Sequence, residues 1–132
     1  MTRVAYADTS CYVAVAFAEP GSTQVADLLQ DFDQVVSSNL LEAELRAAFS
    51  REEVRFEPDL LAGLSWILPD RLLSGEFERV LQAGYVRGAD LWHLAAALYL
   101  AEVPDRLWFL TLDARQREVA GRLGFHLETL NG

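Results

Sequence analysis

The chain has 132 residues, of which 52% are hydrophobic and 23% are charged, and its formal net charge is −9. This length and composition predict a single globular domain over residues 1–132, large enough to bury a hydrophobic core. The negative charge argues against a protein that coats nucleic acid nonspecifically, because such binding depends on cationic groups that neutralise phosphates.

Strand and helix patterns alternate along the chain. A short buried strand is predicted over residues 3–7, and the helix that follows over Ser10–Ala18 is stopped by Glu19-Pro20-Gly21. The remaining predicted elements are a helix at 24–31, a strand at 34–37, a helix at 40–51, a helix at 59–64, a strand or helix end at 66–68, helices at 76–84 and 90–101, a strand at 107–112, a helix at 114–123 and a strand at 125–130. Such alternation favours right-handed parallel connections. The predicted fold class is therefore α/β, a three-layer α/β/α sandwich around a mainly parallel sheet.

Several residue types and segments are missing, and this narrows the class of protein. The chain contains no lysine, which a Walker phosphate-binding loop, a Schiff-base enzyme and a protein kinase all require. Cys11 is the only cysteine, so no internal disulfide can form. No apolar run approaches the roughly 18 residues that span a membrane, and no basic region precedes the first apolar stretch, as it would in a signal peptide. We therefore expect a cytoplasmic protein without a membrane anchor.

Three aspartates stand where a helix begins. Asp8 ends the apolar run Val4–Ala7, so its carboxylate should lie at the carboxyl edge of the sheet, where open α/β folds bind ligands. Asp90 and Asp113 also precede helical patterns, and Asp113 with Gln116 has the spacing of a capping box. N-capping explains each aspartate when it is taken singly. It is compatible with metal binding, because a carboxylate has several lone pairs.

Glu44 is a fourth acid without a basic partner. It lies three residues after Leu41 and four before Ala48, at the edge of an apolar helix face, whereas Glu42 has Arg46 at the spacing of an exposed ion pair. A carboxylate that reaches out to solvent is the alternative for Glu44. Acids gathered without a counter-charge predict a cation from outside, and hard oxygen ligands suit Mg²⁺ or Mn²⁺. Such ions can promote attack by water on a phosphodiester.

The segments around these acids resemble a PIN domain and, more narrowly, a VapC toxin, the ribonuclease of a type II toxin–antitoxin pair. The matching segments are Tyr6-Ala7-Asp8-Thr9-Ser10, Ser38 with Glu44 through Phe49, Ala89 through Ala95, and Thr111-Leu112-Asp113. The resemblance covers essentially the whole chain, with residues 52–80 matching in general pattern. It implies a PIN-like fold and Mg²⁺- or Mn²⁺-dependent hydrolysis of RNA by an endoribonuclease.

The resemblance also implies roles for particular residues and partners. It makes catalytic metal ligands of Asp8, Glu44, Asp90 and Asp113, of which the first three hold the principal ion, and supporting hydroxyls of Ser10 and Thr111. Water would attack the phosphorus without a covalent enzyme intermediate. A family toxin usually forms a homodimer and is inhibited by a cognate antitoxin, whose C-terminal segment wraps it and whose arginine often enters the acidic pocket.

Several other side chains have two interpretations each. His93, one helical turn after Asp90, is either an assistant in the site or a hydrogen-bonded histidine of the core. The three tryptophans either stack on bases or pack in the core or a dimer interface. Arg46, Arg51 and Arg55 either hold phosphates beside the acids or pair with Glu42, Glu52 and Glu53. Arg87 is a separate candidate for a phosphate contact.

Two other functions compete with the ribonuclease. One is a catalytically silent PIN-like module that works by binding in a protein complex. The other is a small phosphatase or nucleotide-binding domain, which the sequence disfavours because position 10 is serine, so that no Asp-x-Asp pair follows the first strand, and because no glycine-rich phosphate loop is present.

Overall fold

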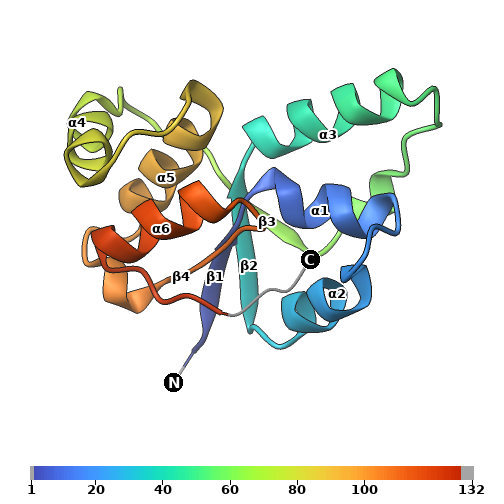
Figure 1. The fold of residues 1–132 in the computed structure, drawn as a ribbon, viewed down its shortest axis with the longest axis horizontal. Coiled ribbons are helices and arrows are strands. Elements are labelled where there is room, and N and C mark those ends of the chain that lie inside the picture. The colour runs from blue at the N-terminus through green and yellow to red at the C-terminus, as the bar shows by residue number, and fades with distance from the viewer. Residues whose placement is uncertain (1, 129–132) are drawn as a thin grey trace.

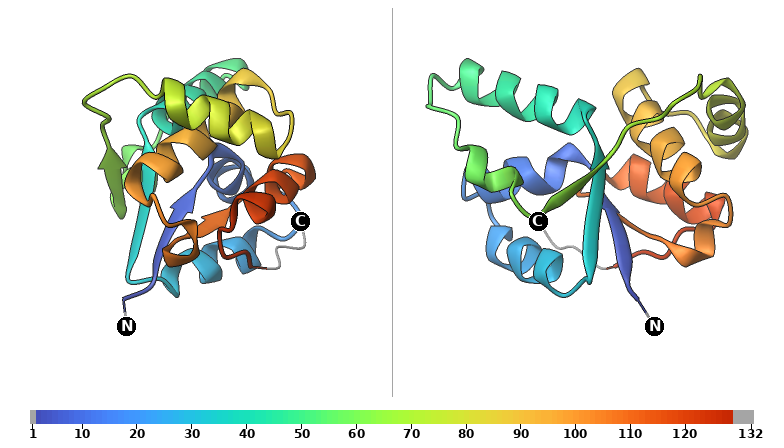
Figure 2. Two further views of the ribbon diagram at one scale, coloured as in Figure 1. Left: turned by 90° about the vertical axis from the view of Figure 1, so that its left-hand side faces the viewer. Right: turned by 180° about the vertical axis from the view of Figure 1, so that it is seen from behind.

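The computed structural model describes residues 2–128 of the chain. Its elements in order are β1 (Val4–Ala7), α1 (Thr9–Ala16), α2 (Ser22–Gln30), β2 (Gln34–Ser38), α3 (Leu40–Arg51), η1 (Pro58–Leu61), β3 (Leu64–Ile67), α4 (Ser74–Ala83), α5 (Gly88–Leu100), η2 (Pro104–Arg106), β4 (Trp108–Leu110) and α6 (Ala114–Leu123). The strands form one sheet in the order β3-β2-β1-β4, and every pairing is parallel. Helices α1, α2 and α3 cover one face and α4, α5 and α6 cover the other (Figure 1 and Figure 2). The predicted three-layer α/β/α fold is confirmed.

The residues of β1 divide the core into two halves. Successive side chains of a strand point to opposite faces of the sheet. Ala5 and Ala7 accordingly belong to the cluster on the α1–α3 side, whereas Tyr6 belongs to the cluster on the other side and stacks on Phe109 with ring centroids 5.3 Å apart. All three β1 residues are fully buried, so the backbone that leads into Asp8 is held firmly in place.

The strand order places a topological switch point between β1 and β4. The chain runs outward from β1 through β2 to β3, and then returns to add β4 on the other side of β1. Ligands of open α/β sheets bind at the carboxyl ends of the strands at such a point. Here the two strand ends are joined by a hydrogen bond from the backbone N–H of Asp8 to the carbonyl oxygen of Leu110, at 3.1 Å.

Three predicted elements differ from the observed ones. The helix predicted over 59–64 is the short 3₁₀ helix η1, which ends at Leu61, and Leu64 belongs to β3. The segment 66–68 is predicted as a strand or a helix end, and its first two residues belong to β3, whereas Leu68 lies beyond that strand. The strand predicted over 125–130 is reduced to a single bridge between His126 and Trp108, and residues 129 and 130 lie outside the described part of the chain. Between residues 2 and 128, no helix is both long and apolar enough to span a bilayer.

Candidate active site

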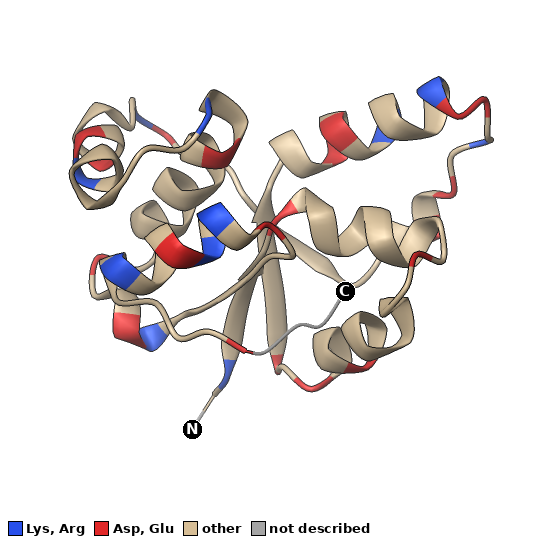
Figure 3. Cartoon of the chain, viewed as in Figure 1, with Lys and Arg blue, Asp and Glu red and all other residues tan. Residues whose placement is uncertain are grey.

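A cavity of about 320 Å³ lies at the carboxyl edge of the sheet, beside the switch point. Its lining residues are Asp8, Thr9, Ser10, Val13, Glu19, Glu44, Asp90, His93, Leu112 and Asp113. The structure therefore brings all four predicted acids to one cavity, from four different parts of the fold. No arginine is among these lining residues. Figure 3 shows acidic segments where α1 and α6 begin, and further ones on α3 and α5.

Asp8 is the most deeply buried of the acids, with 3% of its surface exposed. It caps α1 by accepting a hydrogen bond from the backbone N–H of Ser10 (3.1 Å). The hydroxyl of Ser10 donates to the same oxygen, Oδ1, at 2.5 Å, and the hydroxyl of Thr111 donates to Oδ2 at 2.6 Å. Burial raises the pKa of Asp8 to about 6, because these hydrogen bonds only partly compensate for the loss of solvent.

Ser10 and Thr111 also hold the loop that follows β4. The oxygen of Ser10 accepts from the backbone N–H of Leu112 (2.9 Å), and the oxygen of Thr111 accepts from that of Asp113 (3.0 Å). Each hydroxyl therefore donates its hydrogen to Asp8 and accepts a hydrogen bond from a backbone N–H of the loop. Ser10 and Thr111, whose hydroxyls the resemblance predicts to support an acid, thus connect the start of α1 to the start of α6.

Glu44 is half-buried and is held through one carboxylate oxygen. Its Oε1 accepts from the hydroxyl of Thr9 at 2.6 Å and lies 2.8 Å from Nε2 of His93. Burial raises the pKa of Glu44, but the hydrogen bonds from His93 and Thr9 outweigh it and leave that pKa below its ordinary value. Glu42, two residues earlier on α3, instead forms an ion pair with Arg46 at 2.7 Å. Glu44 thus faces the cavity, as the helical periodicity predicts, and not bulk solvent.

Asp113 and Asp90 differ in their relation to their helices. Asp113 caps α6, with Oδ1 accepting from the backbone N–H of Gln116 at 2.7 Å. The reciprocal half of the predicted capping box is missing, because the backbone N–H of Asp113 donates to the hydroxyl oxygen of Thr111 at 3.0 Å and not to the Gln116 side chain, whose amide nitrogen donates to the backbone carbonyl of Asp90 at 3.2 Å. Capping by Asp90 itself is a wrong prediction: α5 begins at Gly88 with Arg87 at the N-cap, so Asp90 lies within the first turn.

The charges of the site repel one another. Burial raises the pKa of Asp90, and the neighbouring charge of Asp113 raises it further, while Arg87 opposes the rise. The pKa of Asp8 is raised first by burial, and the charge of Asp90 adds to that rise. A cation that entered it would relieve the repulsion.

The donor groups fit a hydrated divalent ion. Carboxylate oxygens are hard ligands of the kind that Mg²⁺ and Mn²⁺ prefer. Within residues 2–128, no three side chains of His, Cys, Asp or Glu converge closely enough to hold one ion directly. Mg²⁺ usually keeps several waters and takes only one or two protein carboxylates, so it does not require three direct ligands. Zn²⁺ prefers nitrogen and sulfur ligands in a closed tetrahedral site, which this cavity does not offer.

Comparison with known proteins assigns the family. The model of the PIN domain family matches residues 5–122 of the chain. The chain belongs to the PIN domain family. A comparison with curated proteins gave no match. PIN domains are generally metal-dependent nucleases, so membership supports a hydrolase that cleaves nucleic acid.

His93 is buried in the core of this PIN domain and also contacts the candidate site. The ring is 2% exposed and its Nδ1 lies 2.7 Å from the hydroxyl of Tyr6, as expected of a hydrogen-bonded histidine in the core. Its other nitrogen contacts Glu44 and the ring lines the cavity. His93 therefore links the core of the PIN domain to one of the candidate catalytic acids.

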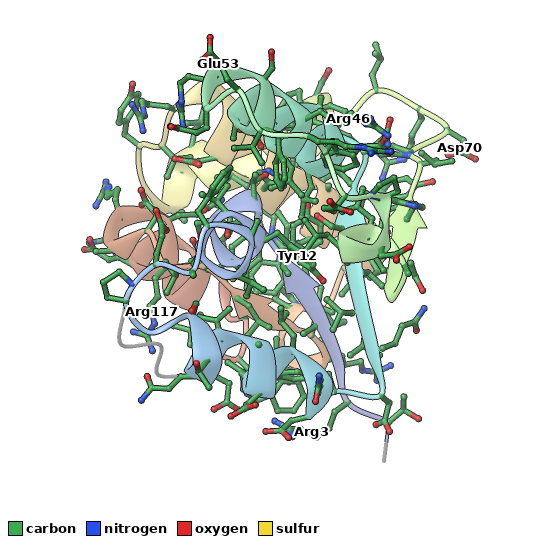
Figure 4. All side chains as sticks on the ribbon, turned by 90° about the vertical axis from the view of Figure 1, so that its right-hand side faces the viewer. Arg3, Tyr12, Arg46, Glu53, Asp70 and Arg117 are labelled. Atoms are coloured by element: carbon green, nitrogen blue, oxygen red, sulfur yellow. The ribbon has the colours of Figure 1, made fainter. Side chains whose placement is uncertain are left out.

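Most of the tryptophans and arginines considered as RNA contacts instead pack on other aromatic rings or form ion pairs with glutamates. Trp92 packs on Phe77 (5.9 Å between ring centroids) and Trp108 packs on Phe32 (5.7 Å), whereas Trp66 is more exposed. The arginines of α3 form ion pairs with nearby glutamates, Arg46 with Glu42 and Arg51 with Glu52. Figure 4 shows Arg46 at the end of the molecule where α3 lies and Arg3 at the opposite end.

Glu19 and Gln116 are among the lining and supporting residues that escaped sequence reasoning. Glu19 lines the cavity from the turn after α1, where Glu19-Pro20-Gly21 signals only a helix stop. Gln116 is fully buried, and its Oε1 lies 3.0 Å from the hydroxyl of Thr111 while its Nε2 reaches the carbonyl of Asp90. The capping-box spacing drew attention to Gln116, but it suggested a local partner instead of these two distant ones.

Proposed function

We propose that this PIN domain is a Mg²⁺- or Mn²⁺-dependent endoribonuclease that hydrolyses RNA phosphodiester bonds and serves as the toxin of a toxin–antitoxin pair. The observation that supports this most directly is the shared cavity at the switch point. Asp8, Glu44, Asp90 and Asp113 reach it from four parts of the fold, and its lining contains no arginine to neutralise them.

The residues of the site divide into ligands and supports. Asp8, Glu44 and Asp90 would hold the principal ion, one or two of them directly and the rest through its waters, and Asp113 would complete the acidic pocket. A divalent ion bound there would supply Lewis-acid activation of water and neutralise charge that develops on the phosphate. Ser10 and Thr111 would keep Asp8 in one orientation, since both of its oxygens accept their hydroxyl hydrogens. Cys11 is buried outside the cavity lining, which favours water over this thiol as the attacking group.

RNA would be held by a few local contacts. The net charge of −9 disfavours a broad electrostatic surface for phosphates. Arg87 is exposed at the start of α5, and its charge acts on Asp90. It is therefore the arginine best placed to hold a phosphate beside the acids.

A cognate antitoxin and a second copy of the chain are the proposed protein partners. The excess of acidic residues favours a basic antitoxin segment, and an arginine from it would neutralise the acidic cavity. Exposed apolar side chains, such as Leu68, Leu72 and Tyr85, favour burial against another chain. We place this activity in the cytoplasm, where an RNA substrate and a reduced cysteine are both expected.

The test is a cleavage assay on a pool of structured cellular RNAs. The protein is purified free of any partner and incubated with Mn²⁺ or with EDTA, and the Asp8→Asn variant serves as the control. Asparagine keeps an oxygen that can cap α1 but removes the charge. Discrete cuts that require both Mn²⁺ and Asp8 are expected. Cuts that persist in EDTA or in the Asp8→Asn variant would overturn the proposal.

A catalytically silent binding module is the second candidate. It is favoured by the absence, among the described residues, of three side chains that converge on one ion site. It predicts a folded protein that binds a basic partner tightly but leaves every RNA in the pool intact with Mn²⁺ present. The same assay therefore separates the two functions.

A further inference from the structure

A buried series of hydrogen bonds runs beneath Glu44. The backbone N–H of Ser38, at the end of β2, lies 3.3 Å from the hydroxyl oxygen of Tyr6. That hydroxyl lies 2.7 Å from Nδ1 of His93, and Nε2 of the same ring lies 2.8 Å from Oε1 of Glu44. Tyr6 and His93 are both essentially inaccessible to solvent. The series thus joins the centre of the sheet to the edge of the acidic cavity.

The direction of these hydrogen bonds follows from the donors available. Ser38 can only donate through its backbone N–H, so it uses a lone pair of the Tyr6 oxygen. The phenolic hydroxyl of a tyrosine carries one hydrogen at neutral pH, and that hydrogen points away from the lone pair that Ser38 uses. A buried hydroxyl hydrogen without an acceptor is costly, and Nδ1 of His93, 2.7 Å from the Tyr6 oxygen, is the nearest acceptor to it. Nδ1 then accepts and Nε2 carries the hydrogen. Nε2 lies 2.8 Å from Oε1 of Glu44 and 3.2 Å from the hydroxyl oxygen of Thr9, so the nearer carboxylate oxygen is its main acceptor.

We propose that His93 is a positioning residue that fixes Glu44 by donating a hydrogen bond from Nε2 to Oε1. This inference rests on the proposed metal-dependent function, for which Glu44 is a ligand. Thr9 donates to the same oxygen at 2.6 Å. Oε2 accepts no hydrogen bond from any residue between 2 and 128, so it is the oxygen left for the ion. Helix α5 thus contributes Asp90 to the site directly and supports Glu44 one turn later through His93.

Two substitutions of the same residue separate positioning from packing. In His93→Gln the amide nitrogen reaches about as far as Nε2, so a donor to Glu44 is kept while the acceptor for Tyr6 is lost. In His93→Asn the side chain ends near the level of Nδ1, so an acceptor for Tyr6 is kept while the donor to Glu44 is lost. Both variants remove ring volume from the core. A residue that only packed there would lose stability in both variants, more in the smaller asparagine, but would not lose Mn²⁺ affinity in one variant and keep it in the other.

The first measurement is Mn²⁺ affinity by isothermal titration calorimetry. Loss of a residue that orients a metal ligand typically weakens binding about 10–100-fold. We expect His93→Asn to weaken Mn²⁺ binding by about tenfold, the lower end of that range, because Thr9 still holds Oε1. His93→Gln should bind Mn²⁺ about as well as the wild type. Equal losses in the two variants, or no loss in His93→Asn, would overturn the inference.

The second measurement needs neither a variant nor a metal. Nitrogen-15 NMR of the ring nitrogens of metal-free wild-type protein reports which nitrogen of His93 carries the hydrogen. A hydrogen on Nε2 and a bare Nδ1 are expected, and the opposite tautomer would overturn the inference even if both variants failed to fold.

The wild-type control distinguishes this inference from the proposed function. Wild-type protein that binds Mn²⁺ but cuts no RNA would overturn the nuclease function alone. Wild-type protein that binds no Mn²⁺ would overturn the role of His93 together with the metal dependence. If the wild type cleaves RNA only with Mn²⁺, and His93→Asn binds Mn²⁺ as tightly as the wild type, then only the role of His93 is overturned.

Discussion

The hydroxyl of Thr111 donates a hydrogen bond to Oδ2 of Asp8 at 2.6 Å, across a separation of 103 positions in the chain. The bond joins the carboxyl ends of β4 and β1, which are neighbours in the sheet. It is buried, and Asp8 receives its other hydrogen bonds from Ser10 on Oδ1. The orientation of the most buried acid therefore depends on a residue from the other end of the chain.

Replacing Thr111 with valine should destabilise the fold. Valine has nearly the same shape but cannot donate to Asp8 or accept from the backbone N–H of Asp113, so buried polar groups lose partners. We expect the free energy of unfolding to fall by about 1–3 kcal/mol, measured by urea titration of metal-free protein. Thr23→Val, at an exposed position of α2, is the matched control and should change stability little. Equal stability of the two variants would mean that the Thr111 bond contributes nothing measurable.

The stability of the metal-free protein should rise as the pH falls from 7 to 5. The pKa of Asp8 is about 6 in the folded protein, above its ordinary value of 3.8, so the folded state takes up a proton at a pH where the unfolded state does not. The buried carboxylate thus costs stability above pH 6, and the cost disappears as Asp8 is protonated. At about 1.4 kcal/mol for each pKa unit, the whole cost is about 3 kcal/mol, of which about 1.3 kcal/mol is recovered between pH 7 and pH 5. The raised pKa of Asp90 acts in the same direction.

The Asp8→Asn variant tests the origin of this pH dependence. It removes the titrating group, so its stability should vary much less between pH 7 and pH 5, and near pH 7 it should exceed that of the wild type. Glu44 does not contribute to the change between pH 7 and pH 5. Its pKa is lowered in the folded protein, so the stability that its carboxylate provides is lost only when the pH falls to about 4 and below. Chemical unfolding at several pH values measures both slopes. Parallel curves for the variant and the wild type would show that Asp8 is not the source.

Divalent metal should stabilise the wild type more than a variant that lacks one acid. A ligand that binds only the folded state adds about 2.7 kcal/mol to stability when its concentration is 100 times its dissociation constant. We expect Mn²⁺ to raise the melting temperature of the wild type and of Glu42→Gln, but to raise that of Glu44→Gln much less. The two glutamates lie two residues apart on α3, yet only Glu44 lines the cavity. Scanning calorimetry at constant ionic strength makes the comparison, and equal shifts in both variants would exclude Glu44 as a ligand.

Local signals in the sequence were sufficient to place three of the four acids. Asp8 and Asp113 each stand between a strand and a helix, and the carboxyl ends of parallel strands meet at one edge of the sheet, so their proximity follows from the fold class. Glu44 follows from helical periodicity, because its position on α3 adjoins the buried face of Leu41 and Leu45. For Asp90 the predicted helix start is two residues too late: α5 begins at Gly88, so Asp90 lies in the first turn and does not cap the helix.

The supporting contacts could not be predicted, because each one joins positions that are distant in the sequence. Tyr6 and His93 are 87 residues apart, and the Gln116 amide reaches a carbonyl 26 residues away. A pattern of apolar and polar residues shows that His93 is on a buried helix face, but not which buried group is opposite it. Glu19 illustrates the same limit, since a helix-stop signal does not indicate where the following turn lies in space.

Arg87→Ala should weaken RNA binding without weakening metal binding. Arg87 is exposed next to the acidic cavity and outside its lining, so it can contact a phosphate without contacting the ion. Removing one contact between an arginine and a phosphate of single-stranded RNA should lower the steepness of log Kd against log salt by about 0.7. Arg106→Ala is the matched control, because Arg106 is also exposed but precedes β4, at the opposite edge of the sheet. To measure this steepness, each arginine substitution is combined with Asp8→Asn, which prevents cleavage, and RNA binding is measured across a salt series. Metal affinity is measured by calorimetry with Mn²⁺ on the variants that carry the arginine substitution alone. An unchanged salt dependence in Arg87→Ala would place the phosphate contact elsewhere, and a loss of Mn²⁺ affinity would show that Arg87 acts on the acids instead.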